Sequence, residues 1–407
     1  MLSLQLKGLV AITFLITIFI AGHVLAADTV NIVMPEPLSG PFKEAGEREV
    51  WGTQFAIDEI NASGGLLGKQ VKLIAEDCEF KPDIAVRKAT RAILEDKAQF
   101  IFQWGSTALA LALMDVAAKH KVVFVSCGGT GDYLTGKYFN KYFFRACLNM
   151  TNFSRGYAEF FKTKPWRKFY LFNPDFASGH EFARALKLVL KKEIPDAKIV
   201  GEDFHPLGTN DFGPYIPKIL ASGAEVIFTA SFVKDLEVMM KQGAQMGVKA
   251  RYAAIYLDHD TVLANVGQAA VGSFENSMYL PTIDTPENKA FVQRWHQKFK
   301  DTKHPWPNGN QGACPIAAMA LFEAIKKAKS FDSEAVIKAF EGMEYDSVFG
   351  KVVMRACDHQ LIRPAFIAEI QAKSTLYPFP FAGTPVMIPR DKVAIPLSEA
   401  ENPRCIK

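Results

Sequence analysis

The chain has 407 residues, of which 49% are hydrophobic, with 47 Lys and Arg against 43 Asp and Glu. A formal net charge of +4, spread evenly along the chain, is too weak to indicate nucleic-acid binding, so that class of protein is excluded. At about 150 residues per domain the length predicts two to three domains, and two lobes are the simplest arrangement.

The N-terminus has the pattern of an export signal. Lys7 supplies a positive charge, residues 9–21 are apolar, and residues 24–26 resemble a small-residue cleavage site. A membrane anchor is the alternative, but a span needs about 20 apolar residues and a Gly-His pair interrupts this one. The sequence therefore predicts a cleaved signal peptide at residues 1–26, a mature chain that begins near Ala27, and a periplasmic location.

Strand and helix patterns alternate after the signal, which is typical of an α/β fold with parallel sheets covered by helices on both faces. The first series predicts strands at 30–34, 69–76, 99–103 and 122–125, and helices at 47–62, 82–94 and 106–120. A second series begins near Thr151, with helices between strands at 168–172, 199–204, 226–230 and 252–256. Later residues predict helices at 290–299, 317–328 and 334–340, a strand at 351–354, and an extended surface segment at 377–389.

The six cysteines are free to form disulfides if the chain is exported, although fifteen complete pairings are possible. Cys357 and Cys405 are the favoured pair, because both lie in a C-terminal segment with little periodic pattern that a disulfide would fix. Free buried thiols are the alternative. Cys357, Asp358 and His359 have no further Cys or His at ligand spacing, so we expect no metal site. We expect no cofactor either.

The segment 37–94 carries three motifs in order. They are the Ser39-Gly40-Pro41 turn, a helix that ends in Glu59-Ile60-Asn61 before two glycines, and an acidic strand end at Glu76-Asp77 before a Pro-Asp helix start. Together they resemble the opening of the leucine/isoleucine/valine-binding family of type I periplasmic binding proteins, which supply ABC importers. The similarity continues at residues 105–107, 126–130, 145, 173–179 and 232–247.

This resemblance implies two doubly wound parallel-sheet lobes joined by three crossover strands. The crossings are expected near residues 147–149, 275–282 and 354–357. The N-terminal lobe would then comprise residues 27–148 and 279–355. The C-terminal lobe would comprise residues 149–278 and 356–407, including an extended tail.

Ligands of such sheets lie at the carboxyl ends of the strands. Ser106 and Thr107 begin a helix there, where a hydroxyl and free N–H groups can receive a carboxylate. Gly128, Gly129 and Thr130 follow another strand, and the matching positions of the family bind the carboxylate and the amine of the ligand. An ordinary N-cap and a simple glycine turn are the alternatives.

The resemblance also implies that the second lobe contributes side chains after its strands. This sequence differs from the family at two positions that matter for binding the amine of the ligand. Relatives that bind aliphatic amino acids usually have an aromatic residue at the place of Ala45 and a Glu near Tyr256 or Leu257. Asp258 is a possible replacement for this Glu or a helix cap, and His259 could meet an acid instead. The candidate residues of the second lobe and the apolar enclosure are Trp104, Phe176, Ser178, Phe232, Tyr256 and Asp258.

The sequence therefore predicts a monomeric periplasmic receptor that captures a small carboxylate-bearing solute and delivers it to an ABC permease and its ATPase. A branched-chain amino acid is the first expectation, and an aromatic or other organic acid without an amine is the alternative. A sensor domain with a separate signalling partner is a second alternative. An enzyme that uses Cys127 is disfavoured, because no nucleophile-elbow pattern surrounds it.

Overall fold

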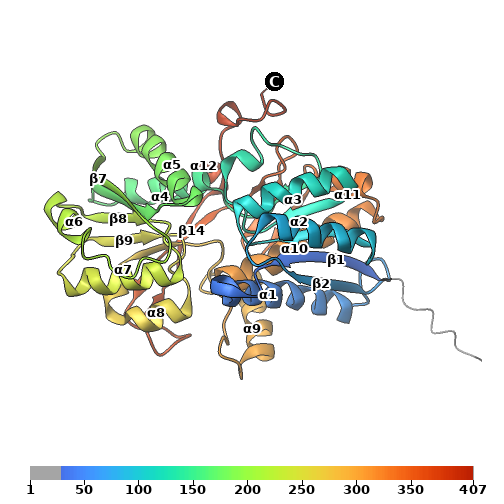
Figure 1. The fold of residues 1–407 in the computed structure, drawn as a ribbon, viewed down its shortest axis with the longest axis horizontal. Helices are drawn as coiled ribbons and strands as arrows, with labels where there is room; N and C mark the ends of the chain where they lie inside the picture. The colour runs from blue at the N-terminus through green and yellow to red at the C-terminus, as the bar shows by residue number, and fades with distance from the viewer. Residues whose placement is uncertain (1–28, 407) are drawn as a thin grey trace, which may run out of the picture.

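The computed structural model describes residues 29–406, so the predicted signal peptide lies outside the described residues. Figure 1 shows two lobes side by side, each with a central sheet between helices. The first lobe holds the N-terminal blue and teal segments together with orange segments from residues beyond 280, and the second holds the green and yellow segments. No helix within residues 29–406 is both long and apolar enough to cross a bilayer.

The first lobe is built on a five-stranded sheet in which all neighbouring strands are parallel, in the order β2-β1-β3-β4-β5. Its central strands are buried, as apolar runs in a sheet covered on both faces should be. The strands are β1 (Val30–Glu36), β2 (Val71–Asp77), β3 (Ala98–Gln103), β4 (Val123–Ser126) and β5 (Phe143–Arg145).

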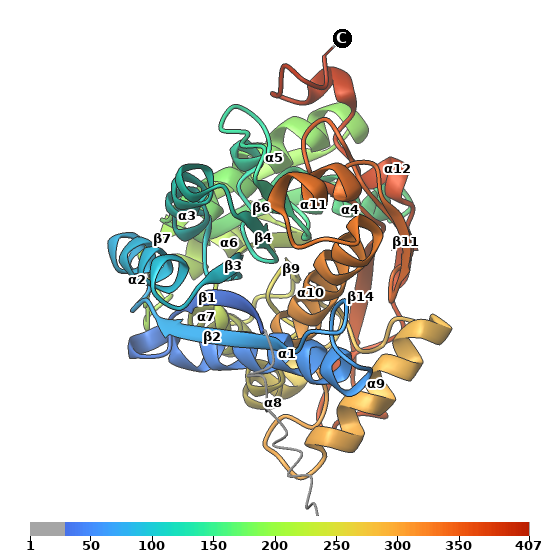
Figure 2. The same cartoon turned by 90° about the vertical axis from the view of Figure 1, so that its right-hand side faces the viewer.

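Helices cover both faces of this sheet (Figure 2). On one face α2 (Pro82–Leu94) packs against α3 (Thr107–His120), and on the other α10 (Gly309–Ala328) packs between α1 (Lys43–Ala62) and α11 (Ser333–Phe340). The α1–α10 contact is close, because a Cβ atom on Gly52 would lie 2.5 Å from the carbonyl oxygen of Gln311. The lobe also contains α9 (Pro286–Phe299) and the 3₁₀ turns η1 (Gly40–Phe42) and η2 (Asp132–Leu134).

The second lobe is built on an eight-stranded sheet with the path β15-β14-β10-β9-β8-β6-β7, in which β16 also pairs with β14. Strands β6 to β10 are parallel, whereas β14 runs antiparallel to β10. The strands are β6 (Lys168–Pro174), β7 (Lys198–His205), β8 (Val226–Thr229), β9 (Arg251–Ala254), β10 (Phe274–Asn276), β14 (Ala365–Gln371), β15 (Phe381–Ala382) and β16 (Val386–Ile388). The helices are α4 (Met150–Lys162), α5 (Ala177–Glu193), α6 (Ile216–Ser222), α7 (Val233–Gln245), α8 (Asp260–Val266) and α12 (Arg390–Val393), with the turns η3 (Gly267–Ala270) and η4 (Leu397–Glu399).

Within residues 29–406 the chain passes between the lobes three times: between β5 and α4, between β10 and α9, and between β13 and β14. The third passage, at residues 363–364, comes later than the 354–357 expected from the sequence. The reason is a small antiparallel sheet of β11 (Glu344–Ser347), β12 (Gly350–Met354) and β13 (Leu361–Ile362), which keeps the chain at the first lobe. Gln360 also bridges to Arg145 of β5.

Two elements differ from the sequence expectation. Helix α10 begins at Gly309 rather than at residue 317, because its first turns are buried on every side and so show no apolar periodicity. The segment 377–389 is extended as expected, but β15 and β16 within it pair with β14, a strand that the sequence did not reveal. A disulfide joins Cys357 to Cys405, the pair that the sequence favoured.

Candidate ligand-binding site

A small cavity of about 60 Å³ lies between the two lobes. Its wall combines loops at the carboxyl ends of β2, β3 and β4 of the first lobe with loops that follow β6, β8 and β9 of the second. It therefore forms only where the lobes meet, as expected for a ligand held at the ends of two facing sheets. The lining residues are Phe80, Trp104, Gly105, Ser106, Thr107, Ala108, Gly128, Thr130, Tyr133, Phe176, Ala177, Ser178, Phe232 and Tyr256.

The wall from the first lobe combines the rings of Phe80, Trp104 and Tyr133 with polar groups at the start of α3. Ser106 is the N-cap of α3, and its hydroxyl oxygen accepts a hydrogen bond from the Leu109 N–H at 3.2 Å. The hydroxyl of Thr107 accepts from the Gly131 N–H at 3.0 Å and so fixes the loop that carries Thr130. The first N–H groups of α3 have no partner inside the helix and carry its positive dipole end, so this wall suits an anion.

Glu36 supports this wall from behind. At the end of β1, its buried carboxylate accepts hydrogen bonds from the N–H groups of Trp104 and Gly105. Burial raises the pKa of Glu36 to about 7, against the hydrogen bonds from Glu49, Trp104 and Gly105, which lower it. Burial and the neighbouring Glu36 raise the pKa of Glu49 well above its usual value.

The wall from the second lobe is aromatic. Phe232 stacks on Tyr256 with ring centroids 5.2 Å apart, and Phe176 meets Phe232 edge-on at 6.3 Å. Phe176 and Phe232 are the N-caps of α5 and α7, so these helices also direct their positive ends at the cavity. Ser178, in the first turn of α5, is 8% exposed, and its hydroxyl has no hydrogen-bond partner within residues 29–406. An unpaired buried hydroxyl at this place is available to a ligand oxygen.

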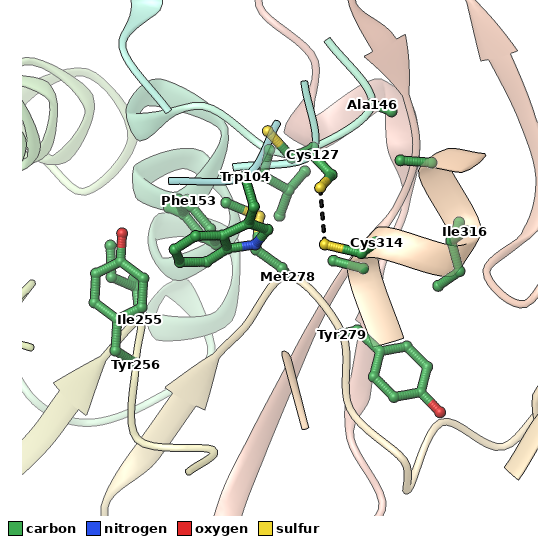
Figure 3. Close-up of a cluster of buried hydrophobic side chains, with 14 of the residues drawn as sticks. Trp104, Cys127, Ala146, Phe153, Ile255, Tyr256, Met278, Tyr279, Cys314 and Ile316 are labelled. Carbon is green, nitrogen blue, oxygen red and sulfur yellow. Dashed lines mark hydrogen bonds between the residues drawn. The ribbon is translucent and has the colours of Figure 1, made fainter. Parts of the chain in front are cut away.

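The described residues that border the cavity are all uncharged. Three helix N-termini thus face a space enclosed by aromatic rings, without a side-chain carboxylate on its wall. Figure 3 shows Trp104 between Tyr256 of the second lobe and the buried Cys127 and Cys314 of the first. This arrangement can bind an anionic group on an apolar body, whereas a buried ammonium would find no charged partner on the wall.

Nine of the predicted ligand residues line the cavity, and two do not: Gly129 and Asp258. The N–H of Gly129 donates to the hydroxyl of Ser126 at 2.9 Å, which turns the loop inside the lobe. The carboxylate of Asp258 accepts a hydrogen bond from the Gly309 N–H at the start of α10. Burial raises the pKa of Asp258 to about 6, against the lowering effect of this bond. Asp258 thus connects the second lobe to a helix of the first.

Neighbouring His259 is buried as well. Its Nδ1 lies 3.5 Å from the side-chain nitrogen of Asn308, and burial lowers its pKa to about 4. His259, and not Asp258, is the N-cap residue of α8. The alternative in which Asp258 caps this helix is therefore wrong.

Sequence reasoning missed five lining residues: Phe80, Gly105, Ala108, Tyr133 and Ala177. Phe80 reaches the cavity from the loop after β2 with a positive φ of 60°, a conformation that no local pattern indicates for a bulky residue. Gly105, Ala108 and Ala177 are direct neighbours of predicted residues, so the signal for them was present.

A group of ionisable side chains joins the lobes outside the cavity lining. Arg48 of α1 pairs with Asp260 of α8 at 2.9 Å and with Glu44 at 2.7 Å, and His304 contacts the second oxygen of Asp260 at 2.9 Å. We call Glu44, Arg48, Asp260 and His304 the interlobe charge cluster. Burial would raise the pKa of Asp260, but the hydrogen bond from His304 and the charge of Arg48 outweigh it and hold the pKa well below its usual value.

The fold and the interlobe cavity define a two-lobed solute-binding protein. A family model described as periplasmic binding protein matches residues 29–375, so the chain belongs to this family, which consists of substrate-binding proteins of ABC transporters. The Leu/Ile/Val-binding protein homolog 4 of Brucella melitensis is 25% identical over 365 residues, 86% of each chain.

Solved structures share the fold. The closed conformation of the leucine-, isoleucine-, valine-, threonine-, and alanine-binding protein of Brucella ovis superposes with a TM-score of 0.81 at 24% identity, covering 91% of this chain and 97% of the other. A solute binding protein of an ABC transporter from Rhodopseudomonas palustris, in complex with 3,4-dihydroxybenzoic acid, has a TM-score of 0.78 at 21% identity, covering 89% and 98%. The ligands in these names differ in chemistry, so the fold alone does not identify the solute.

Proposed function

We propose that this chain is the exported receptor of an ABC importer and that it captures a small monocarboxylate with an apolar, preferably aromatic, body and no ammonium group. The observation that carries the choice of solute is the uncharged, ring-lined cavity at three helix N-termini. The nine lining residues that we expected are the proposed contacts, and delivery to a permease and its ATPase follows from membership of the family.

The carboxylate would lie between Ser106 and Thr130 of the first lobe and Ser178 of the second. Helix N-termini favour an anion, and hydroxyl groups there donate hydrogen bonds to it. Hydrogen bonds to a charged group contribute about 1.5–3 kcal/mol each. Because donors come from both lobes, the ligand would bind the closed form better than an open one and shift the population toward closure.

The body of the solute would lie among Trp104, Phe176, Phe232 and Tyr256. Aromatic pairs in edge-on or offset geometry add about 0.5–1.5 kcal/mol beyond the area that they bury, which favours a ring over an aliphatic chain. A bound ammonium would lose its hydration without gaining a carboxylate partner, at a cost of several kcal/mol. Asp258 does not offset this cost, since it binds the start of α10.

Matched ligand pairs test this proposal. The mature protein is unfolded, freed of bound solute, refolded, and titrated by calorimetry with 4-methylpentanoate against leucine and with 3-phenylpropanoate against phenylalanine. Each pair differs by the amine alone. We expect the amine-free acid to bind more tightly in both pairs and the aromatic acid to bind best. Tighter binding of leucine than of 4-methylpentanoate would overturn the choice of solute.

Variants then locate the site. Ser106→Ala and Thr130→Val should weaken binding of the best acid, whereas Leu188→Ala, on the exposed face of α5, should not. Equal affinity in all three variants would place the carboxylate elsewhere.

A branched-chain amino acid is the second candidate. The names of the Brucella proteins favour it, since both mention leucine, isoleucine and valine. The same calorimetry decides between the candidates, because only this one predicts saturable binding of leucine and valine with loss of affinity on removal of the amine.

A further inference from the structure

Four cysteines of the described chain lie outside the Cys357–Cys405 disulfide, and all four are buried. Two of them, Cys127 and Cys314, direct their sulfur atoms at each other with an Sγ–Sγ distance of 3.0 Å (Figure 3). Cys127 directly follows β4, whereas Cys314 lies in α10, 187 positions further along the chain. The fold alone brings these thiols together.

Two unbonded sulfur atoms do not normally lie this close. A disulfide has an S–S length of about 2.0 Å, so a movement of about 1 Å converts the contact into a bond. Both side chains are fully buried, in a cluster that also holds Trp104, Met278 and Ile316 (Figure 3).

A third thiol provides an internal control. Cys147 is buried at the start of the passage to the second lobe, and its sulfur contacts the carbonyl oxygen of Gly129 at 3.8 Å. It thus shares the environment of the pair without sharing the close sulfur contact.

We propose that Cys127 and Cys314 form a second disulfide when the chain folds in an oxidising compartment. The oxidant is a disulfide of a protein or of a small thiol. One cysteine thiolate attacks it, a mixed disulfide forms and one thiol leaves, and the second cysteine then displaces the other thiol. The two cysteines lose two electrons and two protons, and the oxidant becomes two thiols.

The bond forms during folding, before α10 and the end of β4 are buried in the first lobe. Burial raises the pKa of the Cys127 thiol well above its usual value and raises that of Cys314 as well, so the folded protein holds little of the reactive thiolate. Once made, the bond ties the loop of Gly128 and Thr130 to α10, whose first residue Gly309 binds Asp258. The cavity wall of the first lobe is then fixed covalently to the helix that contacts the second lobe.

Peptide mapping tests the pairing without any variant. The full mature chain is denatured, reduced, and refolded in a buffer of reduced and oxidised glutathione. Free thiols are then alkylated in denaturant, and the protein is digested without reduction for mass spectrometry. We expect a peptide that links Cys127 to Cys314, together with alkylated Cys78 and Cys147. Alkylation of both Cys127 and Cys314, or a link from either to Cys147, would overturn the proposal.

The redox dependence of stability gives a second measurement. We expect wild-type protein and Cys147→Ala to lose on the order of 5 °C more in Tm on reduction than Cys127→Ala, Cys314→Ala and the double variant, which should lose equal amounts. The decrease in Tm that remains in those variants would come from reduction of the Cys357–Cys405 disulfide. A loss on reduction that is the same in all five proteins would refute a second disulfide.

Discussion

The cavity and the interlobe charge cluster both lie where the lobes meet, and their chemistry is opposite. The cavity is bordered by rings, hydroxyls and helix N-termini without a charged side chain, whereas the interlobe charge cluster pairs Arg48, Asp260, His304 and Glu44 directly. In the cluster the protein supplies both charges, so closure is stabilised from within. In the cavity it supplies only a positive dipole field, so the negative charge must come with the solute. Closure of the lobes and recognition of the ligand therefore depend on different sets of residues.

The largest expected effect comes from breaking the charge cluster. Arg48→Ala leaves the buried Asp260 without its charge partner, which costs about 3–5 kcal/mol in comparable sites. Because the pair spans the lobes, we expect the ligand Kd to rise at least about 100-fold, with a more open particle by small-angle scattering. The control is Glu47→Gln on the exposed face of α1. An unchanged Kd and radius of gyration would show that the cluster does not stabilise closure.

Removal of one aromatic ring from the cavity tests whether the rings contribute to ligand affinity. Phe232→Ala removes the central member of the Phe176–Phe232–Tyr256 group. Loss of about 1.5–3 kcal/mol of apolar contact should raise Kd roughly 10- to 100-fold in calorimetry. The lobes should still close when saturated, in contrast to Arg48→Ala. Affinity equal to wild type would remove Phe232 from the site.

A single hydroxyl should have a smaller effect. Ser178→Ala removes a buried group that has no partner in the described chain, so unliganded stability should not fall. The Kd for a carboxylate should rise about tenfold, as expected for one hydrogen bond to a charged group. A fall in Tm without ligand, at unchanged Kd, would instead assign Ser178 to the fold.

The smallest effect concerns the acid pair behind the cavity. Burial raises the pKa of Glu36 to about 7 and raises that of Glu49 well above its usual value. The contribution of this pair to stability is therefore present below pH 4.5 and is lost as pH rises through 7. Glu49→Gln keeps a donor to Glu36 and an acceptor for Asn310 without a proton to lose. We expect the variant to lose less stability than wild type between pH 6 and pH 8 in urea unfolding. Parallel pH profiles would contradict this.

Much of the fold could be predicted, because parallel strands are local apolar runs and amphipathic helices are local periodic patterns. Helix α2 begins and ends where expected, at Pro82 and Leu94. The start of α10 could not be predicted, since it is buried all round, and β14 was missed because its antiparallel pairing depends on a distant strand. For the site, loop residues after strands such as Ser106 were accessible to sequence reasoning, whereas Phe80 and Glu36 act through folded geometry.

The sequence by itself determined the alternating α/β architecture, the resemblance to a solute-binding family, and the loops where a ligand would lie, because each depends on residues close together in the chain. Tertiary structure alone decided that Asp258 binds α10 instead of the cavity, that Arg48 meets Asp260, and that Cys127 meets Cys314. These contacts join residues 51, 212 and 187 positions apart. Such pairings are set by how the elements pack, and no local pattern encodes them.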